Sequence, residues 1–504
     1  MTSPSFPHTP LPAPEVDTAH GRVRGVWRGD SAAFLGIPYA QAPTGERRFA
    51  SPAPPTVWDG VREATAYGPT PQRRPFGDDA TIPEPSIAGD DTLSVNVFTP
   101  APGDSAAKLP VLVWIHGGGY FAGSPASPWY DGAAFTRDGV VTLTVSYRLG
   151  FDGFGWIDGA PLNRGILDQI AALEWVRENI AFFGGDPARV TIAGQSAGGG
   201  SVLALLTSPA AAGLFSAAIS QSGALGVLDA AGAEDLARRY AAYLGIEPDL
   251  EGWRSISEDR LLDTQNDFNN AAGAVTHPHA SISEVVHALL TRSTGASGLV
   301  FSPVVDNEIV VDVVAALASG VASDVPLVLG STAHEFGYPT PGDASHGDAS
   351  HVGAVLEHQG ASVDAVAAFQ DHLDEVGLPF ARSQLISAGL FRVLAVDIVR
   401  ARVEAGAAER TWLYDFRYQS VVDGLAGHCY EIPFVFDVLD APLVARSLGT
   451  TPSPRLAGAM HGAWVSFLTE HTPSWPNVAS PGAMVFAEQS SFDTDAYRFE
   501  RALP

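Results

Sequence analysis

Short apolar stretches recur along the chain at intervals that fit the strands of a sheet. They occupy residues 93–99, 109–115, 140–147, 189–193, 215–220, 325–329 and 411–417. The first alternates between apolar and polar positions, whereas 109–115 and 140–147 are dominated by apolar and β-branched residues. Stretches that are apolar at nearly every position are typical of strands buried on both faces, as in a parallel sheet between two layers of helices. Residues 21–25 alternate around glycine and predict an edge hairpin.

Segments with helical periodicity lie between many of these predicted strands. Over residues 165–180 the apolar positions share one stripe of a helix: Ile166, Ile170, Leu173, Val176 and Ile180. A last helix is predicted over residues 455–470, before Pro473 and Pro476. This alternation predicts an α/β fold with a mostly parallel, doubly wound central sheet and helices on both faces.

We predict one domain, residues 1–504, although length alone would suggest two to four. Large α/β enzymes often consist of a single sheet that carries insertions. Two helical insertions are expected, at about residues 228–293 and 336–388, and together they would form a cap or side region. The later half of the first one carries His277, His279 and His287.

Composition and charge exclude several classes of protein. With 46% hydrophobic and 17% charged residues, the chain is globular rather than disordered. A formal net charge of −27 argues against nucleic acid or an anionic membrane as a partner, because both require a basic face. That charge could steer cationic substrates, although solubility is its simpler role. No stretch reaches the roughly 18 apolar residues that a membrane span needs.

The chain has a single cysteine, Cys429, which rules out an intramolecular disulfide and favours a reducing compartment. Residues 1–17 are rich in proline and lack the basic and apolar regions of a secretory signal. We therefore expect a cytoplasmic location.

A tandem Gly-Asp-Ala-Ser-His repeat occupies residues 342–351. Its two histidines lie beside aspartates, but their spacing is not that of a known metal-ligand set. We interpret the repeat as a duplication in a surface loop, and we predict no metal site and no cofactor.

Residues 194–198 read Gly-Gln-Ser-Ala-Gly and lie between a predicted strand and a predicted helix at residues 201–208. This is the Gly-x-Ser-x-Gly pattern of a nucleophile elbow. Small flanking residues allow a tight, strained turn that lifts the Ser196 hydroxyl clear of the sheet. The helix directs its first N–H groups at any negative charge that develops there. The pattern thus predicts a serine nucleophile.

A serine hydroxyl needs a base in contact, and in such a fold the acid and then the histidine follow the serine in the chain. His428 lies in a glycine-flanked loop after the strand at residues 411–417, where a loop-borne base is expected. The alternatives are His334, His461 and His471.

The acid must orient the imidazole and stabilise its cation. Glu335 follows the strand at residues 325–329 and would lie at the carboxyl end of the sheet. Asp306, Asp312 and Asp423 are the alternatives, although each is more simply a turn or surface residue.

Residues 116–120, His-Gly-Gly-Gly-Tyr, follow the strand at residues 109–115. Three glycines let the backbone approach a substrate and aim two N–H groups at its oxyanion, with the Ala197 N–H as a third donor. A plain glycine turn is the alternative, but its place after a core strand and beside the elbow favours an oxyanion hole.

Taken together, these motifs resemble those of the type-B carboxylesterase family, which includes bacterial para-nitrobenzyl esterases and the cholinesterases. The similarity extends over most of the chain, at residues 34–40, 91–97, 116–120, 146–150, 163–169, 183–198, 220–223 and 428–436. A set of this size is far more specific than any single motif.

The resemblance implies an α/β-hydrolase fold and assigns roles to several residues. The implied triad is Ser196, Glu335 and His428, and the implied oxyanion donors are Gly118, Gly119 and Ala197. By the same match, Ser222 is the family's second serine, which supports the histidine and the acid.

Departures from the family pattern change the expected pocket. The family often closes the loop at residues 71–91 with a disulfide, but Thr92 stands at the cysteine position, so we expect a mobile lid. This loop also lacks the tryptophan of a choline site, and Gln195 replaces the usual glutamate before the nucleophile. Choline esters are therefore not expected as substrates.

We predict a serine carboxylesterase that hydrolyses small neutral or aryl esters through an acyl-enzyme. The expected binding partner is the small-molecule ester, and the protein is expected to be a monomer or a homodimer. Pocket candidates by motif position are Tyr120, Phe121, Phe151, Gln195 and Ser222. The same triad could cleave aryl carbamates or aromatic polyester fragments. A non-catalytic binding module is a remote alternative, because such proteins lack the nucleophile or its base, whereas this chain carries candidates for both.

Overall fold

The computed structural model describes residues 12–71, 73–75, 80–226, 228–271, 281–292, 301–337, 349–376 and 380–504. The predictions made for His277, for His279 and for the repeat as far as residue 348 lie outside these ranges.

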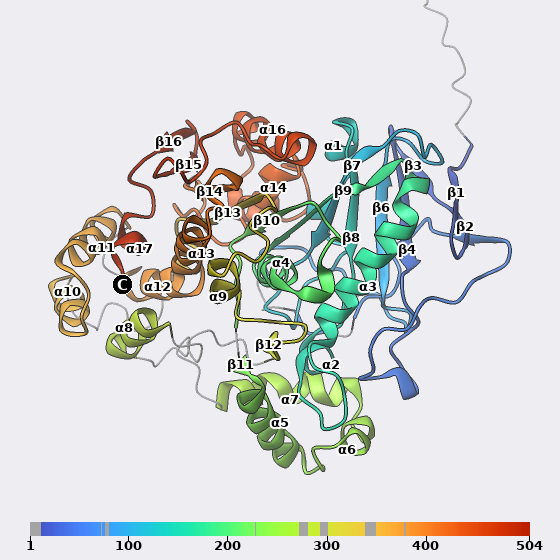
Figure 1. Ribbon diagram of the computed structural model, residues 1–504, viewed down its shortest axis with the longest axis horizontal. Helices are drawn as coiled ribbons and strands as arrows, with labels where there is room; N and C mark the ends of the chain where they lie inside the picture. Colours follow the sequence, from blue (N-terminus) through green and yellow to red (C-terminus); the bar gives the residue numbers. More distant parts are fainter. Residues whose placement is uncertain are drawn as a thin grey trace, which may run out of the picture.

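A mixed sheet of eleven strands runs through the described part of the chain (Figure 1). Its parallel centre consists of β8 (Val141–Val145), β7 (Leu109–Ile115), β9 (Gly185–Gln195), β10 (Ala217–Gln221), β13 (Leu327–Thr332), β14 (Thr411–Phe416) and β15 (Ala483–Phe486), in that order across the sheet. Antiparallel strands complete the edges, with β6 (Ser94–Thr99), β4 (Ser31–Pro38) and β3 (Val26–Arg28) beyond β8, and β16 (Ser491–Asp493) beyond β15.

Helices cover both faces of the sheet, because alternate residues of β7 point into two different apolar cores. Val111, Val113 and Ile115 share one core with α3 (Arg164–Asn179), α4 (Ala197–Thr207), α9 (Val313–Ala318) and α13 (Val393–Glu404). Leu112 and Trp114 share the other with α1 (Ala133–Arg137), α14 (Ile432–Val435) and α16 (Pro454–Glu470). The predicted α/β architecture is therefore confirmed.

Smaller elements complete the described chain. The predicted edge hairpin is formed by β1 (Glu15–Thr18) and β2 (Gly21–Arg24), and β5 (Val61–Glu63) adds a third strand to it. Two further strands, β11 (Leu228–Asp229) and β12 (Val304–Val305), pair in parallel. Short helices α2 (Gly150–Phe154) and α15 (Val444–Leu448) lie in connecting segments.

The helices of the first predicted insertion, residues 228–293, are divided between two apolar cores. Its helices α5 (Ala230–Leu244), α6 (Leu250–Ser255) and α7 (Glu258–Ala271) pack on the main core through Tyr240, Trp253 and Phe268. The next helix, α8 (Ile282–Thr291), belongs to a separate core with α10 (Ala349–His358), α11 (Val363–Val376), α12 (Ala381–Ser387) and α17 (Arg498–Ala502). Figure 1 shows the two groups apart, at the lower edge and at the left of the sheet. The apolar stripe of α8 therefore pairs it with the second insertion.

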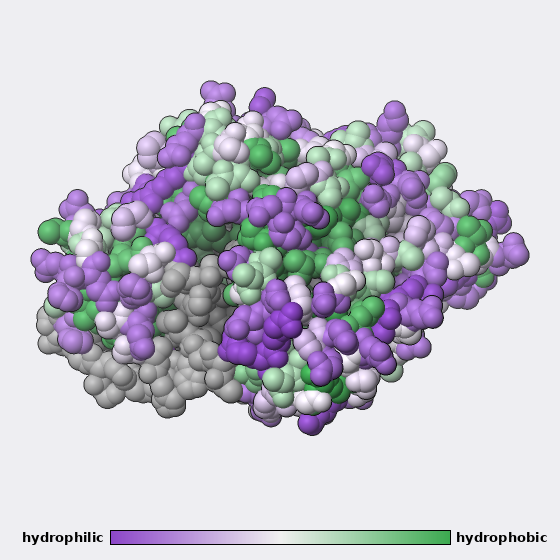
Figure 2. All heavy atoms as spheres, turned by 60° about the horizontal axis from the view of Figure 1, so that its bottom comes forward, coloured by the Kyte–Doolittle hydropathy of each residue, from purple (hydrophilic) through white to green (hydrophobic). Residues whose placement is uncertain are grey.

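The surface is mixed in character. On the face shown in Figure 2, hydrophilic residues cover much of the outline, and hydrophobic residues gather nearer its middle. No helix in the described ranges has the length and apolar character that crossing a membrane requires.

A buried ion pair ties the segment after β8 to α3. Both carboxylate oxygens of Asp168 accept hydrogen bonds from the Arg148 guanidinium, at 2.7 and 2.8 Å, and the Arg148 backbone N–H donates to the same carboxylate at 3.0 Å. The Arg148 side chain also donates to the carbonyl of Ala50. The side chains of Arg148 and Asp168 are 5% and 0% exposed, so breaking the pair would leave a buried charge without its partner.

We expect Asp168→Ala to lower the free energy of unfolding by about 3–5 kcal/mol, as breaking buried pairs does. The control is Asp235→Ala, which breaks an exposed pair with Arg239 within α5 and should cost less than about 0.5 kcal/mol. Urea unfolding of both variants measures the difference. Equal effects would show that Asp168 contributes no more than a surface charge.

Candidate active site

Ser196 lies at the turn between β9 and α4, at the carboxyl end of a central strand. Its backbone angles, φ 59° and ψ −124°, are strained for a residue with a side chain. The Ser196 N–H donates to the carbonyl of Gln221 at 2.9 Å, and its carbonyl accepts from Gly200 and Ala224. This is the geometry of a nucleophile elbow.

The turn requires small residues because α4 passes very close to β7. A Cβ atom at Gly198 would lie 2.0 Å from the carbonyl oxygen of Ile115. The same approach brings the segment after β7 against Ser196, since a Cβ at Gly117 would lie 3.0 Å from the Cβ of Ser196. Glycine at these positions therefore sets how closely the two parts of the site can meet.

Glu335 and His428 meet beyond the carboxyl ends of β13 and β14. The His428 Nδ1 hydrogen bonds to Oε2 of Glu335, and Oε1 of Glu335 accepts the N–H of Thr332 at 2.8 Å. The backbone N–H of His428 also donates to the Glu335 carbonyl, at 2.9 Å. Both side chains are buried. The bond to Glu335 places the imidazole proton on Nδ1 and leaves Nε2 as an acceptor.

The Nε2 atom of His428 faces Gln195. The carboxamide nitrogen of Gln195 lies 3.2 Å from it, and the Cys429 thiol donates to the carboxamide oxygen at 3.3 Å. Within the described ranges, no hydrogen bond joins the Ser196 hydroxyl to His428. Catalytic hydrogen bonds are often long without substrate and shorten only in the complex.

A glycine-rich loop, residues 117–123, follows β7; because it carries two of the predicted oxyanion donors, we name it the oxyanion loop. Gly118 and Gly119 have φ angles of 117° and 59°, and the N–H groups of Phe121 and Ala122 donate to the Gly118 carbonyl. In the part of the chain that is described, the N–H groups of Gly118, Gly119 and Ala197 have no hydrogen-bond partner. Three such donors beside Ser196 are able to bind a negatively charged oxygen.

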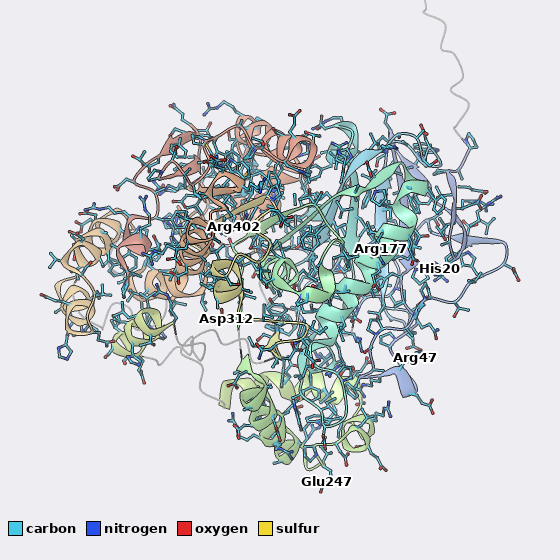
Figure 3. All side chains as sticks on the ribbon, viewed as in Figure 1. His20, Arg47, Arg177, Glu247, Asp312 and Arg402 are labelled. Atoms are coloured by element: carbon cyan, nitrogen blue, oxygen red, sulfur yellow. The ribbon has the colours of Figure 1, made fainter. Side chains whose placement is uncertain are left out.

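The alternative acids have structural roles elsewhere. Asp306 accepts three backbone N–H groups of its own turn, from residues 308–310. Asp312 caps the start of α9, where Figure 3 labels it, by accepting the N–H of Ala315 at 2.9 Å. Asp423 accepts the Tyr430 hydroxyl at 2.6 Å.

The alternative histidines also lie in other surroundings. The Nδ1 of His334 accepts the N–H of Ala426 at 2.8 Å, and burial lowers the pKa of His334 to about 4. His461 lies in α16, where its Nε2 is 2.9 Å from Asp138. His471 ends the same helix.

Two aromatic candidates for the pocket are buried in the core. The Tyr120 hydroxyl donates to the carbonyl of Ala224 at 3.1 Å, and the ring of Phe151 packs at 3.8 Å from that of Trp253. Both side chains are buried, and Phe151 also belongs to the lining of a cavity that it shares with Leu149 and Gln265. Phe121 is partly exposed, whereas Ser222 is fully buried, and its hydroxyl has no partner in the described ranges.

Two aromatic residues that the sequence did not single out flank the imidazole. The rings of Phe336 and Phe391 each lie 4.8 Å from the ring of His428. Phe336 directly follows Glu335, so its place was accessible from sequence. Phe391 lies in a π-helical turn, Ala388–Arg392, far from any motif, and such turns often occur at functional sites.

The sequence pattern of the carboxylesterase family matches residues 12–491 of the chain. The chain belongs to the carboxylesterase family. The para-nitrobenzyl esterase of Bacillus subtilis (strain 168) is 33% identical over 484 residues, which cover 92% of each chain. Phenmedipham hydrolase of Pseudarthrobacter oxydans is 31% identical over 509 residues, 95% of this chain and 96% of that one.

A solved structure of a carboxylesterase from Geobacillus stearothermophilus is similar to this carboxylesterase with a TM-score of 0.80, at 33% identity. The similarity covers 97% of this chain and 100% of the other. The predicted α/β-hydrolase fold is confirmed, and the protein is a carboxylic ester hydrolase.

A second buried carboxyl group, Glu431, lies near Glu335 in this carboxylesterase. Burial, together with the charge of Glu335, raises the pKa of Glu431 to about 8. Gln221 donates to Oε1 of Glu431 at 3.2 Å, while Oε2 has no partner in the described ranges. The raised pKa favours the protonated form of Glu431 at neutral pH, which avoids a second buried negative charge beside Glu335.

The raised pKa of Glu431 predicts that this residue lowers the folding stability by an amount that increases with pH. An unfolded glutamate ionises near pH 4.3, so between there and about pH 8 the folded state binds more protons, and stability falls as the pH rises. The Glu431→Gln substitution keeps the shape of the side chain and removes its titratable carboxyl group. We expect the variant to gain stability relative to wild type from pH 5 to pH 8, as followed by thermal unfolding. A difference that does not change with pH would contradict the raised pKa.

Proposed function

We propose that Ser196 is the nucleophile, His428 its general base and Glu335 the acid that orients His428. The proposal rests chiefly on one observation, the buried hydrogen bond between Glu335 and His428 Nδ1. It leaves Nε2 free to accept a proton, at the same edge of the sheet as the strained turn of Ser196.

In the proposed reaction, the Ser196 oxygen attacks the ester carbonyl while its proton passes to His428 Nε2. The N–H groups of Gly118, Gly119 and Ala197 stabilise the oxyanion that forms. His428 then gives the proton to the departing alcohol, and water hydrolyses the acyl-enzyme by the reverse use of the same groups. Since Gln195 contacts Nε2 in the free enzyme, we propose that substrate binding displaces its carboxamide.

For the substrate, we propose neutral esters with an aryl group. The partly exposed phenyl ring of Phe336 beside His428 offers an apolar surface, and the neutral Gln195 offers no charge to a cation. The name of the para-nitrobenzyl esterase relative also indicates an ester with an aromatic group. Aryl carbamates and aromatic polyester fragments are alternatives for the same site.

We propose a cytoplasmic location, because the single cysteine is a buried free thiol that fits a reducing compartment.

Ser196→Ala should lower turnover by at least about a thousandfold, because only the oxyanion hole and substrate binding would then contribute. The melting temperature should stay nearly the same, since a single hydroxyl is lost. Steady-state hydrolysis of an aryl ester and thermal unfolding give both values. A variant with half the wild-type activity would refute the assignment.

Glu335→Gln should reduce turnover strongly, because the carboxamide no longer stabilises the imidazolium. Asp306→Asn and Asp423→Asn are matched controls, since both aspartates accept hydrogen bonds away from His428. We expect turnover close to wild type in the controls, when each variant is assayed at a temperature at which it is fully folded. If Asp306→Asn is the crippling change, the acid is assigned wrongly.

A neutral aryl ester should be preferred over a matched choline ester by at least about tenfold in kcat/KM, or on the order of 1.4 kcal/mol. The net charge of −27 predicts the opposite order if steering dominates, but steering weakens with salt whereas pocket fit persists. Measurements at low and high salt separate the two effects. A choline preference that survives high salt would contradict the proposed pocket.

A further inference from the structure

The lid segment, residues 80–91, is hydrogen-bonded to the end of the oxyanion loop. Oε1 of Glu84 accepts the N–H of Gly123 at 2.9 Å. The neighbouring hydroxyl of Ser124 donates to the carbonyl of Pro85 at 2.7 Å. Two adjacent contacts therefore connect a loop that lacks a disulfide to the segment that carries the oxyanion donors.

Glu84 is itself fixed by a buried arginine. The Arg73 guanidinium donates to the carbonyls of Glu84 and Pro85, and it lies 3.5 Å from Oε2 of Glu84. The side chains of Arg73 and Glu84 are only 3% and 9% exposed. The Nε of Arg73 has no partner in the described ranges, but the two bonds to backbone carbonyls and the contact with Glu84 hold the pair in a defined geometry. The carboxylate oxygen that faces Gly123 is therefore well positioned.

Gly123 in turn packs against the start of the oxyanion loop. A Cβ atom at Gly123 would lie 2.0 Å from the carbonyl oxygen of Gly117 and 2.5 Å from Nδ1 of His116. The N–H of Ala122 donates to the carbonyl of Gly118 at 2.8 Å, which closes the loop on itself. Because packing is this close, a shift of Gly123 would move Gly118 and Gly119 as well.

We propose that Glu84 is a positioning residue for the oxyanion hole: by holding Gly123 it aims the N–H groups of Gly118 and Gly119. The inference rests on the proposed function, since it concerns the same donors. The docked lid segment then stabilises the tetrahedral adduct, in which the oxyanion exists, far more than the planar ester. The lid segment acts as part of the catalytic framework as well as a cover.

Kinetics of Glu84→Ala and Glu84→Gln test this proposal, with Asp90→Ala as an exposed control in the same segment. Each variant is also titrated with an aryl trifluoromethyl ketone, which forms a tetrahedral adduct, and with the matching methyl ketone. Glu84→Ala should lower kcat about 10–100-fold with KM within about threefold, because misplaced oxyanion donors act on the transition state. Affinity for the trifluoromethyl ketone should fall by a similar factor, and affinity for the methyl ketone should not.

Glu84→Gln should stay within about threefold of wild type, because its carboxamide oxygen still accepts the Gly123 N–H. Equal losses in the Gln and Ala variants would overturn the proposal in favour of the charge pair with Arg73. Equal losses of both ketones would overturn it in favour of general disorder. If Glu84→Ala does not fold, Glu84→Asp replaces it, and wild-type kcat in that variant overturns the proposal. A wild-type enzyme that the trifluoromethyl ketone does not inhibit contradicts the proposed function instead.

Discussion

The strained turn at Ser196 is the constraint on which the rest of the site depends. A residue with φ 59° and ψ −124° persists only where its surroundings hold it, and here they do so through backbone alone. The N–H and carbonyl of Ser196 are bonded to the ends of β10 and α4, and α4 lies so close to β7 that position 198 admits no side chain. This packing presents the hydroxyl, the first N–H of α4 and the oxyanion loop on one side of the sheet. The same packing leaves little freedom for any of them to move independently.

Around this turn, the buried polar groups are arranged to keep one acid in contact with the histidine. Glu335 hydrogen bonds to His428, whereas burial and the nearby Glu335 charge raise the pKa of Glu431. Gln195, which has no charge, faces the other side of the imidazole. This arrangement supports the proposed preference for neutral substrates, because Gln195 offers no negative charge to a cation beside the imidazole.

Much of the fold could be predicted from sequence, since the central strands are apolar at successive positions and their runs coincide with β6 to β10, β13 and β14. The short strands β15 and β16 were missed because they contain few residues and follow a proline-rich segment. The helix α8 lies in the first predicted insertion but packs with helices of the second, since an apolar stripe predicts that a helix is buried but not against which partner. Chain order alone cannot supply such long-range pairing.

The same limit applies to the site. Motifs predicted Ser196, Glu335 and His428 because their chemistry is tied to strand ends that sequence reveals, and in the structure Glu335 and His428 are hydrogen-bonded to each other. Tyr120 and Phe151 were predicted as pocket residues from motif position; both side chains are buried, and Phe151 belongs to the lining of a cavity found among the described residues. The contacts of Gln195 with His428 and of Glu84 with Gly123 join distant segments through side chains. No local pattern carries that information.

The central claim is that Ser196 is the reactive nucleophile, and covalent labelling tests it most directly. The folded enzyme would be treated with a fluorophosphonate, which reacts with activated serines, and the labelled peptide would be identified by mass spectrometry. The account predicts one label for each chain, on Ser196, with loss of esterase activity in proportion to labelling. A label on Ser222, or full labelling with activity retained, would contradict it.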